Sequence, residues 1–180
     1  MRRMLRHVAR FSLQFEQTIA QAMQRSASFR LWTSREFAVV EPPVTVLIID
    51  DDLNAADALA HVLEAHGLEV RTASGGVQAV KSTQQWTPAV IILDIEMPQA
   101  DGFKVARALR TSRRFEVIPI VAHTSLPERE VLDRGSSAQI DAYCRKGKST
   151  QSLLKLIELV APTDVASCPK KQDAIRPPRT

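Results

Sequence analysis

The feature that most constrains this chain is a run of three aspartates, Asp50 to Asp52, at the end of the apolar segment 46–49. A fourth aspartate, Asp94, closes a second apolar segment, 90–93. Short runs of this kind are typical of buried strands, and the carboxyl ends of parallel strands meet at one edge of a sheet. Clustered carboxylates repel one another and are usually neutralised by a cation. The sequence therefore predicts a divalent-metal site at that edge.

From residue 43 onward, short β-branched runs alternate with longer segments of helical periodicity, which predicts βα units and a parallel sheet. The five predicted strands cover residues 44–49, 68–72, 89–93, 117–122 and 140–144. The predicted helices cover residues 54–66, 75–86 and 102–112, a segment beginning near Pro127, and residues 149–160. Almost entirely apolar strands are expected when helices cover both faces of a sheet.

The two flanking segments differ from this pattern, so we predict a single domain over residues 43–160. Residues 1–42 carry seven arginines against three glutamates and are predicted to be a basic extension, disordered or weakly helical. Its apolar stripe leaves a dimerising or a lipid-attracted helix as alternatives. Residues 161–180, with four prolines and mixed charge, are predicted to be a disordered tail.

Composition narrows the classes of partner. The chain has a net charge of +4, but its positive charge lies in the flanks, so the domain itself gives no argument for binding nucleic acid. Two cysteines, Cys144 and Cys168, make no disulfide framework and favour a reducing compartment. No segment approaches the ~18–20 apolar residues of a membrane span. We expect a cytoplasmic protein.

Polar side chains occupy the carboxyl ends of four predicted strands. They are Asp50, Asp51, Asp94, Thr124 and Lys146. Mg²⁺ prefers oxygen ligands, and an aspartate can attack phosphorus to form an acyl phosphate. A lysine and a hydroxyl can stabilise the negative charge on the phosphoryl oxygens. The set therefore indicates phosphoryl transfer to a carboxylate.

The chain resembles the receiver domain of two-component response regulators, of the stand-alone chemotaxis-response-regulator type. Four segments carry the resemblance, in the family's order: VLIIDDD, IILDIEMPQADGF, PIVAHTS and AYCRKG. Together they span about residues 44–160. The resemblance implies a flavodoxin-like, doubly wound sheet of five parallel strands in the order 2-1-3-4-5, with helices on both faces. It also implies a signalling switch and no enzyme, beyond Mg²⁺-dependent self-phosphorylation and slow self-dephosphorylation.

The resemblance assigns a role to each site residue. Asp94 would be the phospho-acceptor, and Thr124 and Lys146 would contact its phosphoryl group. Tyr143 would be an aromatic switch that turns inward when Thr124 moves. The implied Mg²⁺ ligands are Asp50, acting largely through water, Asp51, Asp94 and the backbone carbonyl of Glu96.

The resemblance also implies partners. The phosphodonor would be a histidine kinase or a histidine phosphotransfer protein. A downstream protein would bind the face formed by the fourth helix, fifth strand and fifth helix. Because the residues after 160 are few and polar, we expect a stand-alone receiver with no nucleic-acid output.

Two positions depart from the family pattern. Gly147 follows Lys146 where proline is usual, which predicts either a trans bond with a slightly shifted lysine or a strained turn that glycine permits. Gln139 stands before the fifth strand, where glycine is common, so the loop there is expected to differ.

Other interpretations remain open at this stage. Asp52 is most simply part of the N-cap region of the first predicted helix or a solvated neighbour, and His123 is most simply a satisfied or surface histidine. Asp50 and Asp52 also form the D-x-D pattern of a small haloacid-dehalogenase-like phosphatase, although Asp94 would then lack a role. A receiver-like binding module that is no longer phosphorylated is the third alternative.

Overall fold

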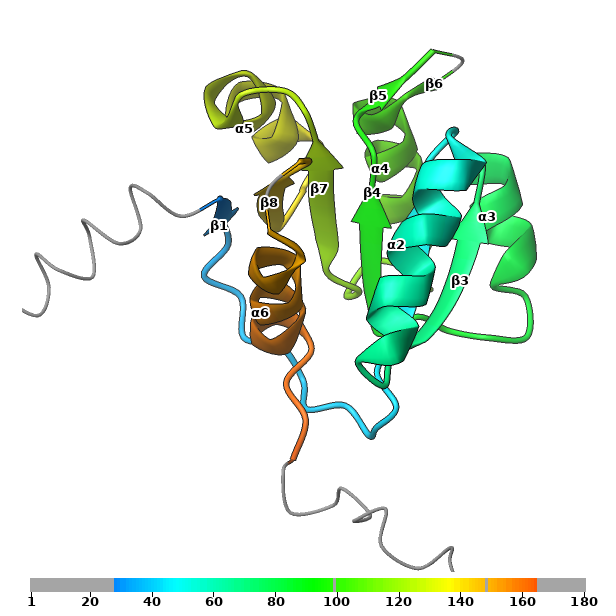
Figure 1. Cartoon of the computed structure of the whole chain (residues 1–180). Coiled ribbons are helices and arrows are strands. Elements are labelled where there is room, and N and C mark those ends of the chain that lie inside the picture. Colours follow the sequence, from blue (N-terminus) through cyan, green and yellow to red (C-terminus); the bar gives the residue numbers. More distant parts are fainter. Residues whose placement is uncertain (1–27, 99, 148, 165–180) are drawn as a thin grey trace, which may run out of the picture.

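The computed structural model of the chain describes residues 28–98, 100–147 and 149–164. Its centre is a six-stranded sheet in the order β1-β8-β7-β4-β2-β3 (Figure 1). The strands of this sheet are β1 (Phe29–Leu31), β2 (Thr45–Ile49), β3 (Glu69–Ala73), β4 (Val90–Leu93), β7 (Ile120–Thr124) and β8 (Ala142–Arg145). Five of them run parallel, and β1 pairs antiparallel with β8 at one edge.

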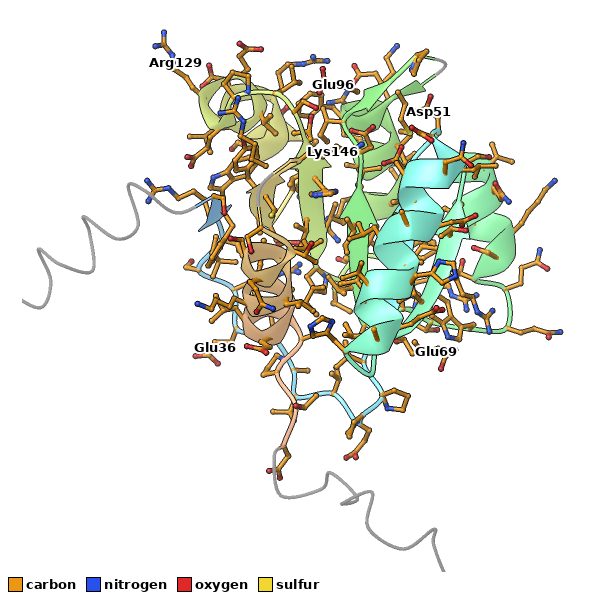
Figure 2. The ribbon with its side chains drawn as sticks, viewed as in Figure 1. Glu36, Asp51, Glu69, Glu96, Arg129 and Lys146 are labelled. Atoms are coloured by element: carbon orange, nitrogen blue, oxygen red, sulfur yellow. The ribbon has the colours of Figure 1, made fainter. Side chains whose placement is uncertain are left out.

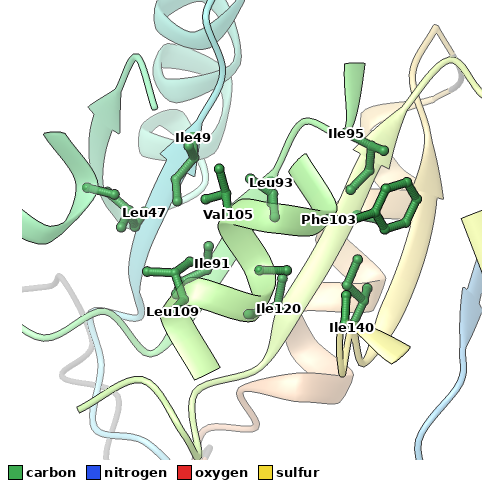
Figure 3. Packing of buried hydrophobic residues seen from close by; sticks show 14 of the residues in the cluster. Leu47, Ile49, Ile91, Leu93, Ile95, Phe103, Val105, Leu109, Ile120 and Ile140 are labelled. Carbon is green, nitrogen blue, oxygen red and sulfur yellow. The ribbon is translucent and has the colours of Figure 1, made fainter. Parts of the chain in front are cut away.

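Helices cover both faces of the sheet. The described helices are α2 (Leu53–Ala65), α3 (Gly76–Ser82), α4 (Gly102–Arg110), α5 (Glu128–Ser137) and α6 (Thr150–Val160). Alternate strand residues face opposite sides, so two apolar clusters form. One cluster packs beneath α3, α4 and α5, as Figure 3 shows for Phe103 and Leu109 against the strands. The other packs beneath α2 and α6.

The predicted fold class is confirmed. The five parallel strands, taken in chain order, lie in the predicted order 2-1-3-4-5. The sheet nevertheless has a sixth strand that the sequence did not predict. A small separate hairpin, β5 (Glu96–Met97) with β6 (Ala100–Asp101), also follows β4. No described helix has the length and apolar character needed to cross a membrane.

Several predicted bounds were wrong by a few residues. The fourth predicted strand, 117–122, is β7 at Ile120–Thr124, because Pro119 lacks an N–H and the residues before it form a turn. The second predicted helix, 75–86, ends at Ser82. There the Thr83 hydroxyl donates to the carbonyls of Ala79 and Val80, which satisfies carbonyl groups at the C-terminal end of the helix.

The predicted extension 1–42 needs correction in its described part. Residues 28–42 are neither helical nor detached: Phe29–Leu31 forms β1, and Val40 makes a backbone bond to Pro162. The possible helix in residues 1–27 and the tail at 165–180 lie outside the described residues. Residues 29–31 form a strand because β8 would otherwise be the edge of the sheet, and its backbone groups need the partners that β1 supplies.

Side-chain caps fix where the site-bearing helices begin. The Asp52 carboxylate accepts a hydrogen bond from the Ala55 N–H at 3.1 Å, so Asp52 is the N-cap of α2, as predicted. Asp101 caps α4 in the same way through the Phe103 N–H at 3.0 Å. Gly102 lies against the backbone of Asp94 and Ile95, where a Cβ atom would clash. This close approach seats α4 directly behind Asp94.

Candidate functional site

Three carboxylates gather at the carboxyl edge of the sheet. Asp50 follows β2 and Asp94 follows β4, and these two strands are hydrogen-bonded neighbours. One ligand oxygen from each of Asp50, Asp51 and Asp94 lies within 4.8 Å of the others. Asp50 and Asp94 are only 4% and 5% exposed, whereas Asp51 is exposed. The predicted acid cluster is thus assembled, with two members buried and one facing solvent.

The backbone orients both buried carboxylates in the same manner. The Asp52 N–H donates to Asp50 Oδ1 at 3.0 Å, and the Glu96 N–H donates to Asp94 Oδ1 at 3.0 Å. Each acid therefore has one oxygen held by the amide two residues later, in a local turn typical of aspartate. The second oxygen of each carboxylate faces Lys146.

Lys146 stands between the two buried acids. Its Nζ lies 2.8 Å from Asp50 Oδ2 and 2.9 Å from Asp94 Oδ2. Burial lowers the pKa of Lys146, but its hydrogen bonds to Asp50 and Asp94 and their charges outweigh that effect, so its pKa is raised. The side chain stays an ammonium at neutral pH. Figure 2 shows Lys146 at the end of the sheet that also carries Asp51 and Glu96.

The turn after Lys146 depends on glycine. Gly147 has φ 73°, in the left-handed region that glycine occupies readily, and its bond to Lys146 is trans, so features of both predicted alternatives are present. The Lys146 N–H donates to the Thr124 carbonyl at 2.9 Å and continues the pairing of β8 with β7. With glycine after it in place of proline, Lys146 still contacts both Asp50 and Asp94 through Nζ. Gln139, the other departure, has φ 54°, and its carbonyl accepts two bonds from Arg110, at 3.0 and 2.9 Å.

Thr124 ends β7 and is fully buried, at the same edge. Its hydroxyl donates to Glu96 Oε2 at 3.1 Å, and the Ser125 N–H donates to the same oxygen at 3.1 Å. A hydroxyl and an adjacent amide thus form a small anion-binding pair, which the Glu96 carboxylate occupies. The sequence assigned a ligand role to the Glu96 carbonyl but did not predict these two bonds to its side chain.

Tyr143 connects the site to the edge of the sheet. The ring is buried on β8, and its hydroxyl donates to the Leu126 carbonyl at 2.8 Å. The Leu126 N–H in turn donates to the Thr124 hydroxyl oxygen at 3.3 Å. Burial raises the pKa of Tyr143, so the phenol keeps its proton for this bond. The tyrosine is therefore linked to Thr124 through two hydrogen bonds.

His123 lies beside Thr124 and is partly buried on β7. Burial, followed by the positive charge of Lys146, lowers the pKa of His123 to about 4. The imidazole is therefore neutral at neutral pH. Its neighbour on β8, Cys144, is buried, and burial raises the pKa of this thiol to about 11, which makes it unreactive.

The doubly wound sheet carries three acids, a lysine and a buried threonine at its carboxyl edge, the arrangement expected of an α/β domain that accepts a phosphoryl group on a carboxylate. A sequence model of the response regulator receiver domain matches residues 46–158. The chain belongs to this family. Receiver domains are signalling modules of two-component systems.

Individual relatives agree with the family. The chain is 35% identical over 103 residues to the gliding motility regulatory protein of Myxococcus xanthus, covering 57% of this chain and 13% of that protein. It is 32% identical over 118 residues to the transcriptional regulatory protein PdtaR of Mycobacterium tuberculosis, covering 65% of this chain and 56% of that one. The chain thus spans about half or less of the curated relatives' lengths.

Solved structures similar to this one belong to the same family. It is similar to the chemotaxis protein CheY4 of Vibrio cholerae, with a TM-score of 0.62 and 29% identity over 65% of this chain and 98% of that one. A putative response regulator from Chloroflexus aurantiacus gives a TM-score of 0.61 at 29% identity, covering 66% of this chain and 97% of that one. Both solved structures are matched over almost their whole length.

The donor set fits the Mg²⁺ that receiver domains bind. Asp50, Asp51 and Asp94 offer only oxygens, which are the preferred ligands of this ion. Two of the three carboxylates are buried and share a single lysine, so the described cluster has more negative than positive charge. A bound Mg²⁺ would supply the missing positive charge and help neutralise an incoming phosphoryl group.

Proposed function

We propose that this chain is a phospho-accepting switch in which Asp94 receives a phosphoryl group from a phosphohistidine on a histidine kinase or histidine phosphotransfer protein. The observation that best supports this proposal is the position of Lys146 Nζ, 2.9 Å from Asp94 Oδ2 and 2.8 Å from Asp50 Oδ2. A phosphoryl group on Asp94 would therefore form beside a fixed positive charge. Asp50, Asp51 and the Glu96 carbonyl are the proposed metal ligands with Asp94.

The transfer follows from the chemistry of the side chains. Oδ2 of Asp94, the oxygen beside Lys146, attacks phosphorus, the P–O bond of the acyl phosphate forms, and the bond to the donor breaks. The donor leaves with the bonding electron pair: a phosphohistidine whose other ring nitrogen carries a proton leaves as neutral histidine, and acetyl phosphate leaves as acetate. Lys146, the Thr124 hydroxyl and the Ser125 N–H then contact the phosphoryl oxygens.

Two observations support this function over a phosphatase of the haloacid-dehalogenase kind. Asp52, the acid that such a phosphatase would need, is engaged as the N-cap of α2. Asp94, which the phosphatase would leave without a role, is buried against Lys146. The geometry therefore favours Asp94 as the acceptor.

Intact-protein mass after incubation with acetyl phosphate and Mg²⁺ tests the proposal. We expect a gain of one phosphoryl group in the wild type, none in Asp94→Asn, and none after metal removal. Asp133→Asn, which changes an exposed acid on α5, is the matched control and should gain the group normally. Phosphate release that survives Asp94→Asn would favour the phosphatase, and no gain in any variant would favour a binding module.

The same site suggests how the signal leaves it. We define the signalling face as the surface of α5, β8 and α6, which we propose a downstream protein binds. When the phosphoryl group draws Thr124 away from Glu96, Leu126 and the Tyr143 hydroxyl follow through their two hydrogen bonds. The position of Tyr143 thus reports phosphorylation to the signalling face.

Amide hydrogen exchange at β8 tests this coupling. Phosphorylation should change exchange at residues 142–145 in the wild type and in Thr124→Ser, which keeps the hydroxyl. Thr124→Val, compared at equal phosphoryl occupancy, should lose the change. An equal response in Thr124→Val would mean that the signal takes another route.

A further inference from the structure

The signalling face is already covered by a segment of this chain. Residues 28–32 run antiparallel along the outer edge of β8, with Arg30 opposite Tyr143. Two further backbone bonds extend the pairing: the Arg145 N–H donates to the Ser28 carbonyl at 2.9 Å, and the Trp32 N–H donates to the Asp141 carbonyl at 2.8 Å. Figure 1 shows β1 beside β8 and next to α6.

Trp32 sits directly over the proposed switch residue. Its ring stacks on the Tyr143 ring, with centroids 5.8 Å apart and planes 15° from parallel. The indole also lies close to α5 at Gly135, where a Cβ would come within 3.0 Å of its Cζ3 atom. The indole N–H donates to Glu128 Oε1 at 3.3 Å. One side chain therefore bridges β8 and α5.

Two arginines of the same segment form ion pairs with the domain. Arg30 pairs with Glu128 of α5 at 3.4 Å. Arg35 pairs with Asp141 at 3.3 Å and donates to the carbonyls of Glu116 and Val117. Both arginines remain partly exposed, at 29% and 38%, so each pair contributes little to stability on its own.

These contacts describe a weakly held edge. The strand has only three residues and lies at the border of the sheet. It is held by the backbone bonds to β8, two partly exposed ion pairs, the stack on Tyr143 and the partly buried Phe29, without a strand on its outer side. Elements of this kind open at low free energy, whereas the central strands open only with the whole domain. The chain continuing into β2 keeps the segment nearby, so it can return readily after release.

We propose that residues 28–35 are a detachable cover of the signalling face, and that docking of the cover and phosphorylation of Asp94 oppose each other. This inference rests on the proposed function. A movement of Thr124 is transmitted to Tyr143 through the hydrogen bonds that both make with Leu126. The Tyr143 ring is the surface on which the Trp32 ring stacks. Shifting the tyrosine ring removes the surface on which the indole packs.

The contacts of the cover also indicate what a partner protein must displace. A downstream protein that binds the signalling face has to displace a strand from β8 and an indole from the surface of Tyr143. The cover carries Arg30 and Arg35 to acidic positions, Glu128 and Asp141, so an extended segment with an aromatic and basic residues has the fitting chemistry. The cover thereby keeps the face closed until Asp94 is phosphorylated.

Hydrogen exchange on the full chain, with phosphoryl occupancy read from intact mass, tests the release. In the phosphorylated protein, exchange at residues 29–32 should rise at least about five-fold, the lower range of typical coupling between sites. Residues 69–73 of β3, at the opposite edge, serve as the internal reference. Unchanged exchange at residues 29–32 in fully phosphorylated protein would overturn the proposal of a detachable cover and leave the proposed phospho-accepting function standing. Failure to gain the phosphoryl group overturns the proposed function and the coupling with it.

The converse follows from linkage: releasing the cover should favour phosphorylation. Trp32→Ala should be phosphorylated by acetyl phosphate about five-fold faster than the wild type. Trp86→Ala removes the other tryptophan, which stacks on Arg71 away from the signalling face, and should leave the rate unchanged. Glu128→Gln weakens two cover contacts without touching the core, and should give a smaller increase. Equal rates in all four folded proteins would contradict the cover.

Discussion

The Thr124 hydroxyl donates a hydrogen bond to the Glu96 carboxylate, 3.1 Å away. The same carboxylate oxygen also accepts the Ser125 N–H, so a negative group fills the pair of donors that a phosphoryl oxygen would use. In the unphosphorylated protein, Glu96 therefore holds the end of β7 in place. Phosphorylation has to displace this carboxylate before Thr124 can contact the new anion.

Replacing Glu96 should therefore speed phosphorylation. Glu96→Gln keeps the size of the side chain and removes the charge that repels and competes with the phosphoryl group. A net loss of about 1 kcal/mol in the competing bond corresponds to about a five-fold faster reaction with acetyl phosphate. The rate is followed by intact mass at fixed Mg²⁺. A rate equal to or below that of the wild type would show that Glu96 does not compete.

Gly102 should be needed both for stability and for placing Asp94. A Cβ at this position would lie 2.6 Å from the Ile95 Cα and still closer to the Asp94 carbonyl, so the backbone behind the acceptor must move. Gly102→Ala should lose about 2–3 kcal/mol in the free energy of unfolding, measured with urea, and should be phosphorylated more slowly.

Gly75→Ala is the matched control for that change. Its φ of 162° is extended backbone, and a Cβ there would meet nothing within 4 Å. The variant should stay within about 0.5 kcal/mol of the wild type. If both alanine variants behaved alike, the close packing of α4 against Asp94 would not be the reason for glycine.

The residues at the strand ends could be predicted from the sequence because the five parallel strands are recognisable as short apolar runs. Once the strands are parallel, Asp50, Asp94, Thr124 and Lys146 must lie at one edge, and the structure brings them together there. The order of the strands came from the resemblance, since apolar runs by themselves do not specify their neighbours.

The missed features share a different cause. The four residues Phe29 to Trp32 are too short a run to predict a strand, and their partner β8 is more than a hundred residues away in sequence. The Glu96 side chain and the ion pairs of Asp141 likewise depend on contacts between distant elements. Asp141 did leave one signal, as a charged residue in an otherwise apolar run, which requires a partner when buried.

Asp141 should be a major determinant of stability. Its side chain is 5% exposed and accepts bonds from Arg110 at 2.6 Å and from the Ile120 N–H at 2.9 Å, besides its pair with Arg35. Asp141→Asn would leave the buried Arg110 guanidinium without its counter-charge. We expect a loss of about 3 kcal/mol in urea unfolding.

Glu158→Gln gives the comparison for that loss. It neutralises an exposed acid on α6 and should change stability by less than about 0.5 kcal/mol. Wild-type stability in Asp141→Asn would mean that the carbonyls around Arg110, rather than Asp141, hold the guanidinium.

His123 should make the domain less stable in mild acid. Its pKa falls from 6.5 to about 4 in the folded protein, because burial and the charge of Lys146 disfavour the imidazolium. The unfolded chain therefore binds the proton first as pH decreases. Above about pH 6.5 the histidine is neutral in both the folded and the unfolded state, so it costs no stability. As pH falls from about 6.5 toward 4, only the unfolded chain is protonated, so the free energy of unfolding decreases.

The comparison with His123→Gln isolates this contribution. Urea unfolding of both proteins, without Mg²⁺, should give a wild-type stability that falls by about 2 kcal/mol more than that of the variant between pH 7.5 and pH 4.5. Below about pH 4 the two curves should run parallel, because the histidine is then protonated in both the folded and the unfolded state. Parallel curves across the whole range would mean that folding leaves the pKa of His123 unchanged, and hence that it lies in water rather than beneath the site.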